Sequence, residues 1–199
     1  MGTIKYHRFL VAGFAVILML AVLTSCTSAT PQDLSGVPEE IQLLDTDTGQ
    51  VFYLGMQKSQ IHSKKLVKSD EFSERSEFFD SYLYEGVNML FYHDKLIFMQ
   101  VKDTSPKGRF KARGLELGSS VDEMRVVYGN ETTYSHFSNS YSYIILNEGE
   151  FYYFKSLAEY KDQATAESSL YILNFIMDGD NRIESFSIFN EKFMDVDLQ

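Results

Sequence analysis

The chain has 199 residues, of which 44% are hydrophobic and 23% are charged, which is enough for one compact domain and argues against wholesale disorder. Its formal net charge of −10 argues against a nucleic-acid partner, because phosphates are bound mainly by Lys and Arg. The single cysteine excludes a framework of internal disulfides. We expect a small acidic globular protein.

Residues 1–25 have the pattern of a secretory signal peptide. Lys5 and Arg8 give a basic start, and the fifteen residues of 9–23 that follow carry no charge. A bilayer-spanning helix needs roughly 20 apolar residues, so this run is too short for a span. It ends in Leu23-Thr24-Ser25-Cys26, which resembles a bacterial lipobox. The resemblance implies cleavage before Cys26 and a diacylglyceryl group on its thiol; a plain secretory signal or an uncleaved signal anchor is the alternative.

Acylation of Cys26 predicts where the protein is held. One acyl chain binds a bilayer only marginally, whereas two or more, such as a diacylglyceryl group together with palmitate, give a durable anchor. We therefore expect a lipoprotein on the extracytoplasmic face of a bacterial membrane. Residues 26–40, which include two prolines and no periodic hydrophobicity, are typical of a short tether.

A β-hairpin is predicted at the start of the folded part. The apolar stretches 41–44 and 51–54 flank Asp45-Thr46-Asp47-Thr48-Gly49, whose Asx residues and glycine favour a turn. The aspartates also suggest a calcium loop, but Gly49 and Met56 stand where an EF-hand needs oxygen ligands. We interpret this segment as a turn.

An internal echo is the most informative pattern of the chain. Phe52-Tyr53-Leu54-Gly55, followed by Ile61, recurs 63 residues later as Leu115-Glu116-Leu117-Gly118, followed by Met124. In the second copy, Ser120 and Glu123 form a capping-box pair, which predicts a helix that ends near Gly129. In the first copy, a helix is expected over 56–68, although its apolar positions are sparse and no serine caps it.

Antiparallel hairpins are predicted after each helix. Residues 87–92 and 96–101 flank a polar turn at 93–95, and residues 170–177 and 182–189 flank another at 178–181. Two further strands are expected at 141–146 and 151–154. The predicted fold is α+β, with two tandem repeats, 41–108 and 109–199, that each pack a short helix on antiparallel β-hairpins.

This plan resembles the β-lactamase-inhibitor-protein fold, in which such a unit is duplicated. A single similar unit occurs in the small lipoprotein of the outer-membrane β-barrel assembly machinery. The phrase from Leu117-Gly118 to Tyr128-Gly129 is also similar to one in uncharacterised lipoproteins of Gram-positive bacteria. The resemblance implies an architecture. It carries over no inhibitory residue, because no binding motif of the inhibitor family is matched.

Motifs for chemistry are scarce in the chain. His62, His93 and His136 are far apart and belong to no zinc-binding pattern, and the only cysteine is assigned to the lipid. There is no GxSxG or SxxK nucleophile motif and no glycine-rich phosphate loop. We therefore expect no metal, no cofactor and no enzymatic activity, with an envelope enzyme as the rival class.

Charge and aromatic residues are unevenly distributed, and each distribution suggests a contact surface. From Lys58 to Arg113 there are 11 basic and 8 acidic residues, whereas residues 114–199 hold 5 basic and 15 acidic ones. A candidate interaction patch is formed by Lys107, Arg109, Lys111 and Arg113. A solvated linker is the alternative. The tyrosine-rich strands between Tyr134 and Phe154 are the other candidate surface, with ordinary packing on both sheet faces as the alternative.

The function expected from these features is binding. We expect a lipid-anchored, non-catalytic protein of the bacterial cell envelope that acts through contacts with an envelope protein. An inhibitor or immunity lipoprotein that blocks an envelope enzyme or a toxin is the alternative binding role.

Overall fold

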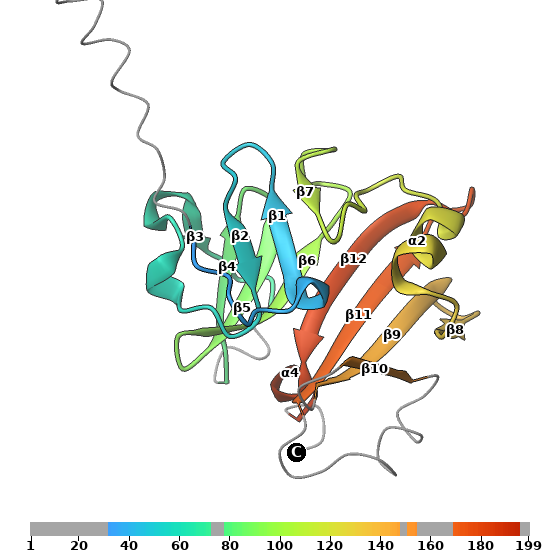
Figure 1. Cartoon of the computed structure of the whole chain (residues 1–199). Coiled ribbons are helices and arrows are strands. Elements are labelled where there is room, and N and C mark those ends of the chain that lie inside the picture. Colours follow the sequence, from blue (N-terminus) through green and yellow to red (C-terminus); the bar gives the residue numbers. More distant parts are fainter. Residues whose placement is uncertain (1–31, 73–77, 148–150, 155–168, 196–199) are drawn as a thin grey trace, which may run out of the picture. The chain divides into compact units, whose positions relative to one another are not determined.

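The computed structural model describes residues 32–72, 78–147, 151–154 and 169–195 (Figure 1). The chain divides into two compact units, residues 1–34 and 35–199. The second unit contains all the helices and strands described below. Among the described residues, no helix is long and apolar enough to cross a membrane.

A nine-stranded antiparallel sheet forms most of the unit. The strand order is β10-β9-β11-β12-β6-β5-β4-β3, and β8 pairs with one end of β9. Its strands are β3 (Leu66–Lys68), β4 (Asp80–Tyr84), β5 (Val87–Tyr92), β6 (Lys95–Val101), β8 (Thr133–Ser135), β9 (Ser140–Asn147), β10 (Phe151–Phe154), β11 (Ser169–Met177) and β12 (Ile183–Asn190). The structure is thus mostly antiparallel sheet with few helices, which agrees broadly with the predicted α+β class.

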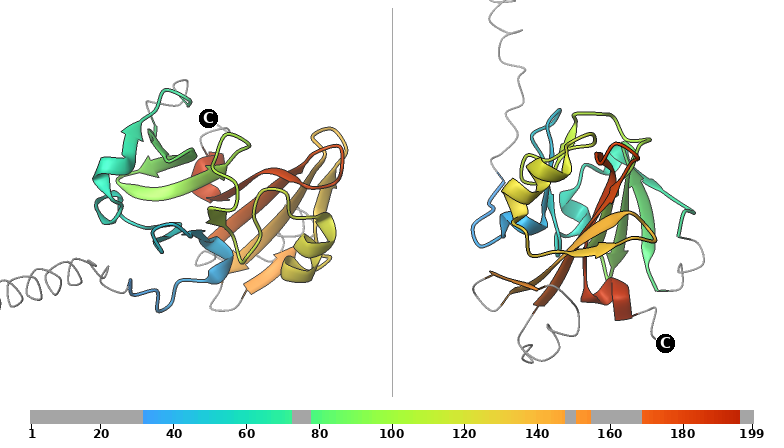
Figure 2. Two further views of the ribbon diagram at one scale, coloured as in Figure 1. Left: turned by 90° about the horizontal axis from the view of Figure 1, so that it is seen from above. Right: turned by 90° about the vertical axis from the view of Figure 1, so that its right-hand side faces the viewer.

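The middle of the large sheet joins two segments that are far apart in sequence. Strands β6 and β12 pair there in an antiparallel register that places Val101 opposite Phe186 and Phe98 opposite Phe189. In Figure 2, the green strands of the earlier segment and the red strands of the later one lie next to each other. Each of these strands is also half of a predicted hairpin, β5–β6 or β11–β12.

A second, smaller sheet has the strand order β2-β1-β7 and is separate from the large sheet. Strands β1 (Gln42–Asp45) and β2 (Val51–Tyr53) form the hairpin predicted from the Asx-rich turn. Strand β7 (Phe110–Lys111) adds to β1 from the connector between the two predicted repeats.

The helices are short. Helix α2 (Val121–Tyr128) begins after Ser120, whose hydroxyl accepts a hydrogen bond from the Glu123 N–H. Gly129 follows its last residue, as the sequence predicts. The remaining helical segments are α4 (Glu191–Asp195) and the 3-10 turns η1 (Glu39–Ile41), η2 (Lys58–Gln60) and η3 (Ser63–Lys65).

The helix expected over 56–68 is not an α-helix. Its place is taken by η2, η3 and the edge strand β3. Ile61 ends η2 in an extended conformation, and β3 then satisfies its backbone groups by pairing with β4. Pairing with the sheet therefore outweighs the weak helical pattern of this segment.

The main core lies on one face of the large sheet. Residues of the small sheet, such as Phe52, and of α2, such as Met124, pack there against Met99 and Phe186. The other face carries α4, whose Phe193 ring stacks on Phe98 with centroids 4.6 Å apart. The sheet is therefore covered on both faces in its central part.

Two glycine corners attach the segments before η2 and α2 to the sheet. Gly55 has φ +90° and its N–H donates to the Leu96 carbonyl at 2.7 Å, while the Leu96 N–H donates to Met56. Gly118 has φ +91° and its N–H donates to the Ile183 carbonyl at 2.8 Å, while the Ile183 N–H donates to Ser119. These φ values lie in the region that favours glycine.

Candidate interaction surfaces

The predicted lipidation site, Cys26, lies outside the described residues, as do the signal peptide and the first part of the tether. Its assignment rests on the sequence alone. The other predicted site residues, Lys107, Arg109, Lys111 and Arg113, are all described.

The buried member of the predicted basic patch is Arg109. Its guanidinium binds the Asp45 carboxylate at two points, Nε to Oδ1 at 2.8 Å and Nη2 to Oδ2 at 3.0 Å. Asp45 is fully buried, and Glu85 in the β4–β5 turn accepts a further hydrogen bond from Arg109 at 3.2 Å. Two-point pairing of this kind fixes both side chains in one geometry. Arg109 thus holds the connector onto the first hairpin rather than facing solvent.

The Asp45 carboxylate is the centre of this ionic cluster. It also accepts hydrogen bonds from the Tyr84 hydroxyl at 3.1 Å and the Thr48 hydroxyl at 2.9 Å. Burial alone would raise the pKa of Asp45, but the hydrogen bonds from Arg109 and Thr48 outweigh it and hold that pKa below its ordinary value. Burial, together with the neighbouring Asp45 carboxylate, raises the pKa of Tyr84 to about 12. Asp45 is therefore a structural anion.

The remaining members of the patch differ in their surroundings. Lys111 pairs with Glu116 at 3.2 Å, and Arg113 pairs with Glu40 at 3.5 Å and lies over the Tyr128 ring. Lys107 is exposed. The four side chains do not form one exposed cationic surface, because Arg109 is buried and two others have carboxylate partners.

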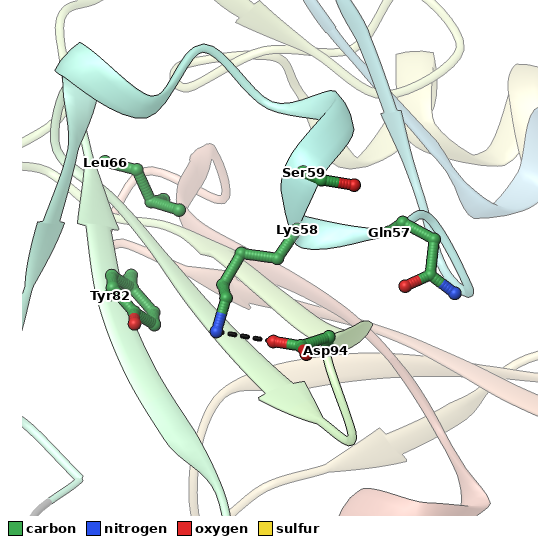
Figure 3. Close-up of a pocket in the computed structure, with 6 residues that line it drawn as sticks. All are labelled: Gln57, Lys58, Ser59, Leu66, Tyr82 and Asp94. Atoms are coloured by element: carbon green, nitrogen blue, oxygen red, sulfur yellow. Dashed lines mark ion pairs between the residues drawn. The ribbon is translucent and has the colours of Figure 1, made fainter.

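A hollow of about 430 Å³ lies between η2 and the strands β3 and β4 (Figure 3). The Lys58 ammonium points into it, 2.6 Å from Asp94 and 3.3 Å from Asp80, and lies over the Tyr82 ring. The hydrogen bond to Asp94 raises the pKa of Lys58 in spite of its partial burial. A protonated, paired lysine is neither a nucleophile nor a base.

Metal-ligating side chains do not gather in the described part of the chain: no group of three or more His, Cys, Asp or Glu residues there could hold an ion. His62 and His93 are exposed on the first half, and His136 is exposed on the β8–β9 hairpin.

The tyrosine-rich strands are divided between the core and the surface. Tyr143 is fully buried beneath α2, where its ring lies 5.3 Å from Tyr128. Tyr134 and Phe137, on the β8–β9 hairpin, are exposed, and Phe137 is as exposed as an isolated residue. The side chains of 151–154 lie outside the described part. Tyr143 and Tyr141 lie on the same face of β9, and Tyr134 is paired opposite Tyr141, so it is the cover provided by α2 that decides which ring is buried.

A chain of aromatic contacts links this hairpin to α2. The Tyr134 ring lies 4.6 Å from His136 and 4.7 Å from Tyr141, and the Arg125 guanidinium of α2 lies over Tyr141 at 5.6 Å. We refer to Arg125, Tyr134, His136, Phe137 and Tyr141 together as the aromatic corner.

Two neighbouring features extend the surface of the aromatic corner. Val126 of α2, next in sequence to Arg125, is 87% exposed. The Asn139 amide donates to the backbone carbonyls of Met177 and Asp178, which ties the hairpin to the acidic β11–β12 turn. Asp122, on the same helix as Arg125, and Asp180, in the β11–β12 turn, are exposed carboxylates.

No protein-family model matches the chain, and comparison with curated proteins and with solved structures found no significant match. The functional interpretation therefore rests on the residues themselves.

Proposed function

We propose that the protein is a lipid-anchored, extracytoplasmic binding protein of the bacterial envelope, and that it acts by contacts with an envelope protein and not by catalysis. The observation that carries the binding role is the aromatic corner, with Phe137 fully exposed at a hairpin tip. The anchor rests on the lipobox-like Leu23-Thr24-Ser25-Cys26.

The composition of the hairpin supports a contact role. Residues 132–143 are all Thr, Tyr, Ser, His, Phe or Asn, so twelve consecutive positions carry no Asp, Glu, Lys or Arg. Tyrosine and phenylalanine bring large contact areas with few torsions to freeze, and Ser and Asn adapt their hydrogen bonds to a partner. Binding would also remove the Phe137 ring from water, which is favourable at about 25 cal/mol per Å².

The charge around the corner indicates the partner's chemistry. Arg125 and Arg182 contribute two cations, whereas four carboxylates, Asp122, Glu123, Asp178 and Asp180, lie on the adjoining helix and turn. A partner with an apolar pocket and a basic border would complement this surface and would be guided to it at low ionic strength.

The fold supports a second, finer proposal, that the domain consists of two related units. The offset of 63 that relates Gly55 to Gly118 also relates Lys58 to Val121, and both N–H groups donate to hairpin tips, at Asp94 and Asn181. The residues that accept these hydrogen bonds are also related by a constant offset. Leu96 and Ile183 are 87 positions apart in sequence, and so are Asp94 and Asn181.

Two further hydrogen bonds are related by the offset of 63 residues. The Gln57 N–H donates to the Gln60 side chain at 2.9 Å, and the Ser120 N–H donates to the Glu123 side chain at 2.7 Å. Agreement of local bonds and of both offsets favours duplication over coincidence.

The binding role is tested by photo-crosslinking in intact cells with a photoreactive phenylalanine analogue at position 137. The expected result is a discrete crosslinked product whose protein component can be identified. The same analogue at Tyr92, an exposed aromatic residue at the end of β5, is the matched control and should give no such product. Equal products at both positions, or none at 137, would overturn the proposal. Identification of an enzyme or a toxin as the product would support the inhibitor or immunity role.

The anchor is tested separately with a labelled fatty acid. Cys26→Ser should abolish incorporation and leave the precursor unprocessed at this site, because the thioether needs the thiol. Equal incorporation into wild type and variant would refute lipidation at Cys26.

A further inference from the structure

We propose that the β3 edge of the large sheet docks on an anionic phospholipid bilayer and orients the anchored domain. The inference rests on the proposed lipid anchor. It starts from the segment of residues 57–69, which contains Lys58, Lys64, Lys65 and Lys68 and no acidic residue. The segment forms η2, η3 and β3.

The structure separates these four lysines into two pairs. Lys58 is bound to Asp80 and Asp94, and Lys65 pairs with Glu85 at 3.3 Å. Lys64 and Lys68 are exposed, and no carboxylate of the described residues pairs with either. Among the described residues of the segment 57–69, the charge that remains available to a partner is therefore positive.

Apolar side chains accompany the two exposed lysines. Val67 is 62% exposed and precedes Lys68 in β3, so the two side chains flank this edge from opposite faces of the sheet. The register of β3 and β4 places Val67 opposite Leu83, which is also exposed. An exposed strand edge with apolar and basic side chains matches the interface of an anionic bilayer, which attracts the ammonium groups and accepts apolar side chains at the level of the headgroups.

Because the lipid anchor already holds the domain at the membrane, a docking surface of low affinity is sufficient to orient it. Eight residues separate Cys26 from Ser35, where the folded unit begins, so the extended chain reaches at most about 30 Å. A tethered domain meets the bilayer at a high effective concentration, and the docking surface has only to select one orientation.

The charge of the rest of the domain favours the same orientation. Residues 114–199 hold 15 acidic and 5 basic side chains. An anionic surface repels this half and attracts the β3 edge, so the aromatic corner on the second half is left available to a protein partner.

The test uses the mature lipidated protein in vesicles. Because the Cys26 thiol is then blocked as a thioether, Val67→Cys introduces the only free thiol, which takes a polarity-sensitive fluorophore. We expect a blue shift of the label on vesicles of phosphatidylglycerol and phosphatidylcholine relative to phosphatidylcholine alone. The shift should be lost at high salt and in a Lys64→Gln, Lys68→Gln background, since screening and charge removal both weaken the attraction.

The matched control is Val126→Cys, whose label lies on the acidic half and should not respond to the lipid charge. Equal emission of the Val67 label on both kinds of vesicle, or an equal shift at Val126, would overturn the proposal. Failure of the anchor has a different signature. Absence of labelled fatty acid from the wild type would refute the anchor, whereas a Val67 label that still shifts on anionic vesicles in a Cys26→Ser background would support the docking edge without the anchor.

Discussion

The segments that follow the two glycine corners differ although the corners themselves agree. At Gly118 the chain continues into α2, which is capped by Ser120 and Glu123. At Gly55 it makes two separate 3-10 turns, η2 and η3, and then joins the sheet edge as β3. Ile61 and Met124, 63 residues apart, are both buried. The corner and its buried side chain thus depend on glycine and on pairing with a hairpin tip, whereas continuation as a helix depends on the cap and on what competes for the backbone.

The two halves also differ in how they are fixed to the connector. The first half holds it through the buried cluster of Asp45, Tyr84 and Arg109. The second half is fixed to its glycine corner by backbone bonds and by Arg182, whose guanidinium donates to the Gly118 carbonyl. The first half should therefore be the more sensitive to loss of one charge.

Replacement of Arg109 tests this difference with the largest expected effect. Arg109→Met leaves the Asp45 carboxylate buried without its cation, which should lower the free energy of unfolding by about 3–5 kcal/mol. Arg113→Met, at a partly exposed ion pair, is the control and should lower it by no more than about 1 kcal/mol. Urea denaturation measures both. A double variant, Arg109→Met with Asp45→Asn, should recover part of the loss, and a loss that does not recover would contradict the ionic explanation.

The pH dependence of stability should report the same cluster. The pKa of Tyr84 is about 12 in the folded protein, and the ordinary value is 10.0, so folding favours the neutral phenol. This contribution is complete below pH 10 and is lost as pH rises through 12; two pKa units correspond to about 2.7 kcal/mol. Thermal unfolding of the wild type and of Tyr84→Phe between pH 9 and about 12 measures it. Equal slopes in the two proteins would contradict the assignment.

Alanine at each glycine corner tests whether the corners are equivalent. Gly55→Ala and Gly118→Ala both place a Cβ at a positive φ, and no neighbouring atom lies within 4 Å of that Cβ. Each should therefore lower the free energy of unfolding by roughly 1–2 kcal/mol through backbone strain alone. Chemical denaturation checks this, and a difference of more than about 1 kcal/mol between the variants would argue against equivalent corners.

The smallest effect is expected at the residues that begin the two helical segments. Ser120→Ala removes an acceptor for the Glu123 N–H and should lower the free energy of unfolding by about 1 kcal/mol. Gln57→Ala, at the matching position, begins only a 3-10 turn and should change it by less than about 0.5 kcal/mol. Circular dichroism with denaturation compares the two, and equal losses would show that the cap does not distinguish the segments.

Local patterns of the sequence predicted much of the fold. The Asx-rich turn after β1, the capping pair at the start of α2 and the polar turn at 93–95 are each determined by neighbouring residues, and each is present. The helix over 56–68 was wrong because pairing of β3 with β4 is a tertiary interaction that propensity does not contain. Local sequence signals were therefore sufficient to predict the class of the fold. They were not sufficient to predict that residues 66–68 form an edge strand of the sheet.

The surfaces were harder to predict than the fold. Arg109 looked like one of several connector cations, and nothing near it in sequence indicates its partner Asp45, 64 residues away. Tyr143 and Tyr134 look alike in sequence, but only pairing and the position of α2 decide which one is buried. The charge-free run 132–143 was a usable signal for the aromatic corner, and the acid-free run 57–69 was one for the β3 edge.

The pairing of β6 with β12 constrains the order in which the domain can form. Val101 and its partner Phe186 are 85 residues apart, and synthesis proceeds from the N-terminus. Until β12 arrives, β6 keeps one edge without its hydrogen-bonding partner, and apolar residues such as Met99 are open to other strands. Contacts so distant in sequence also slow folding. The newly made chain therefore has a period of vulnerability to aggregation that ends only when its last strand is in place.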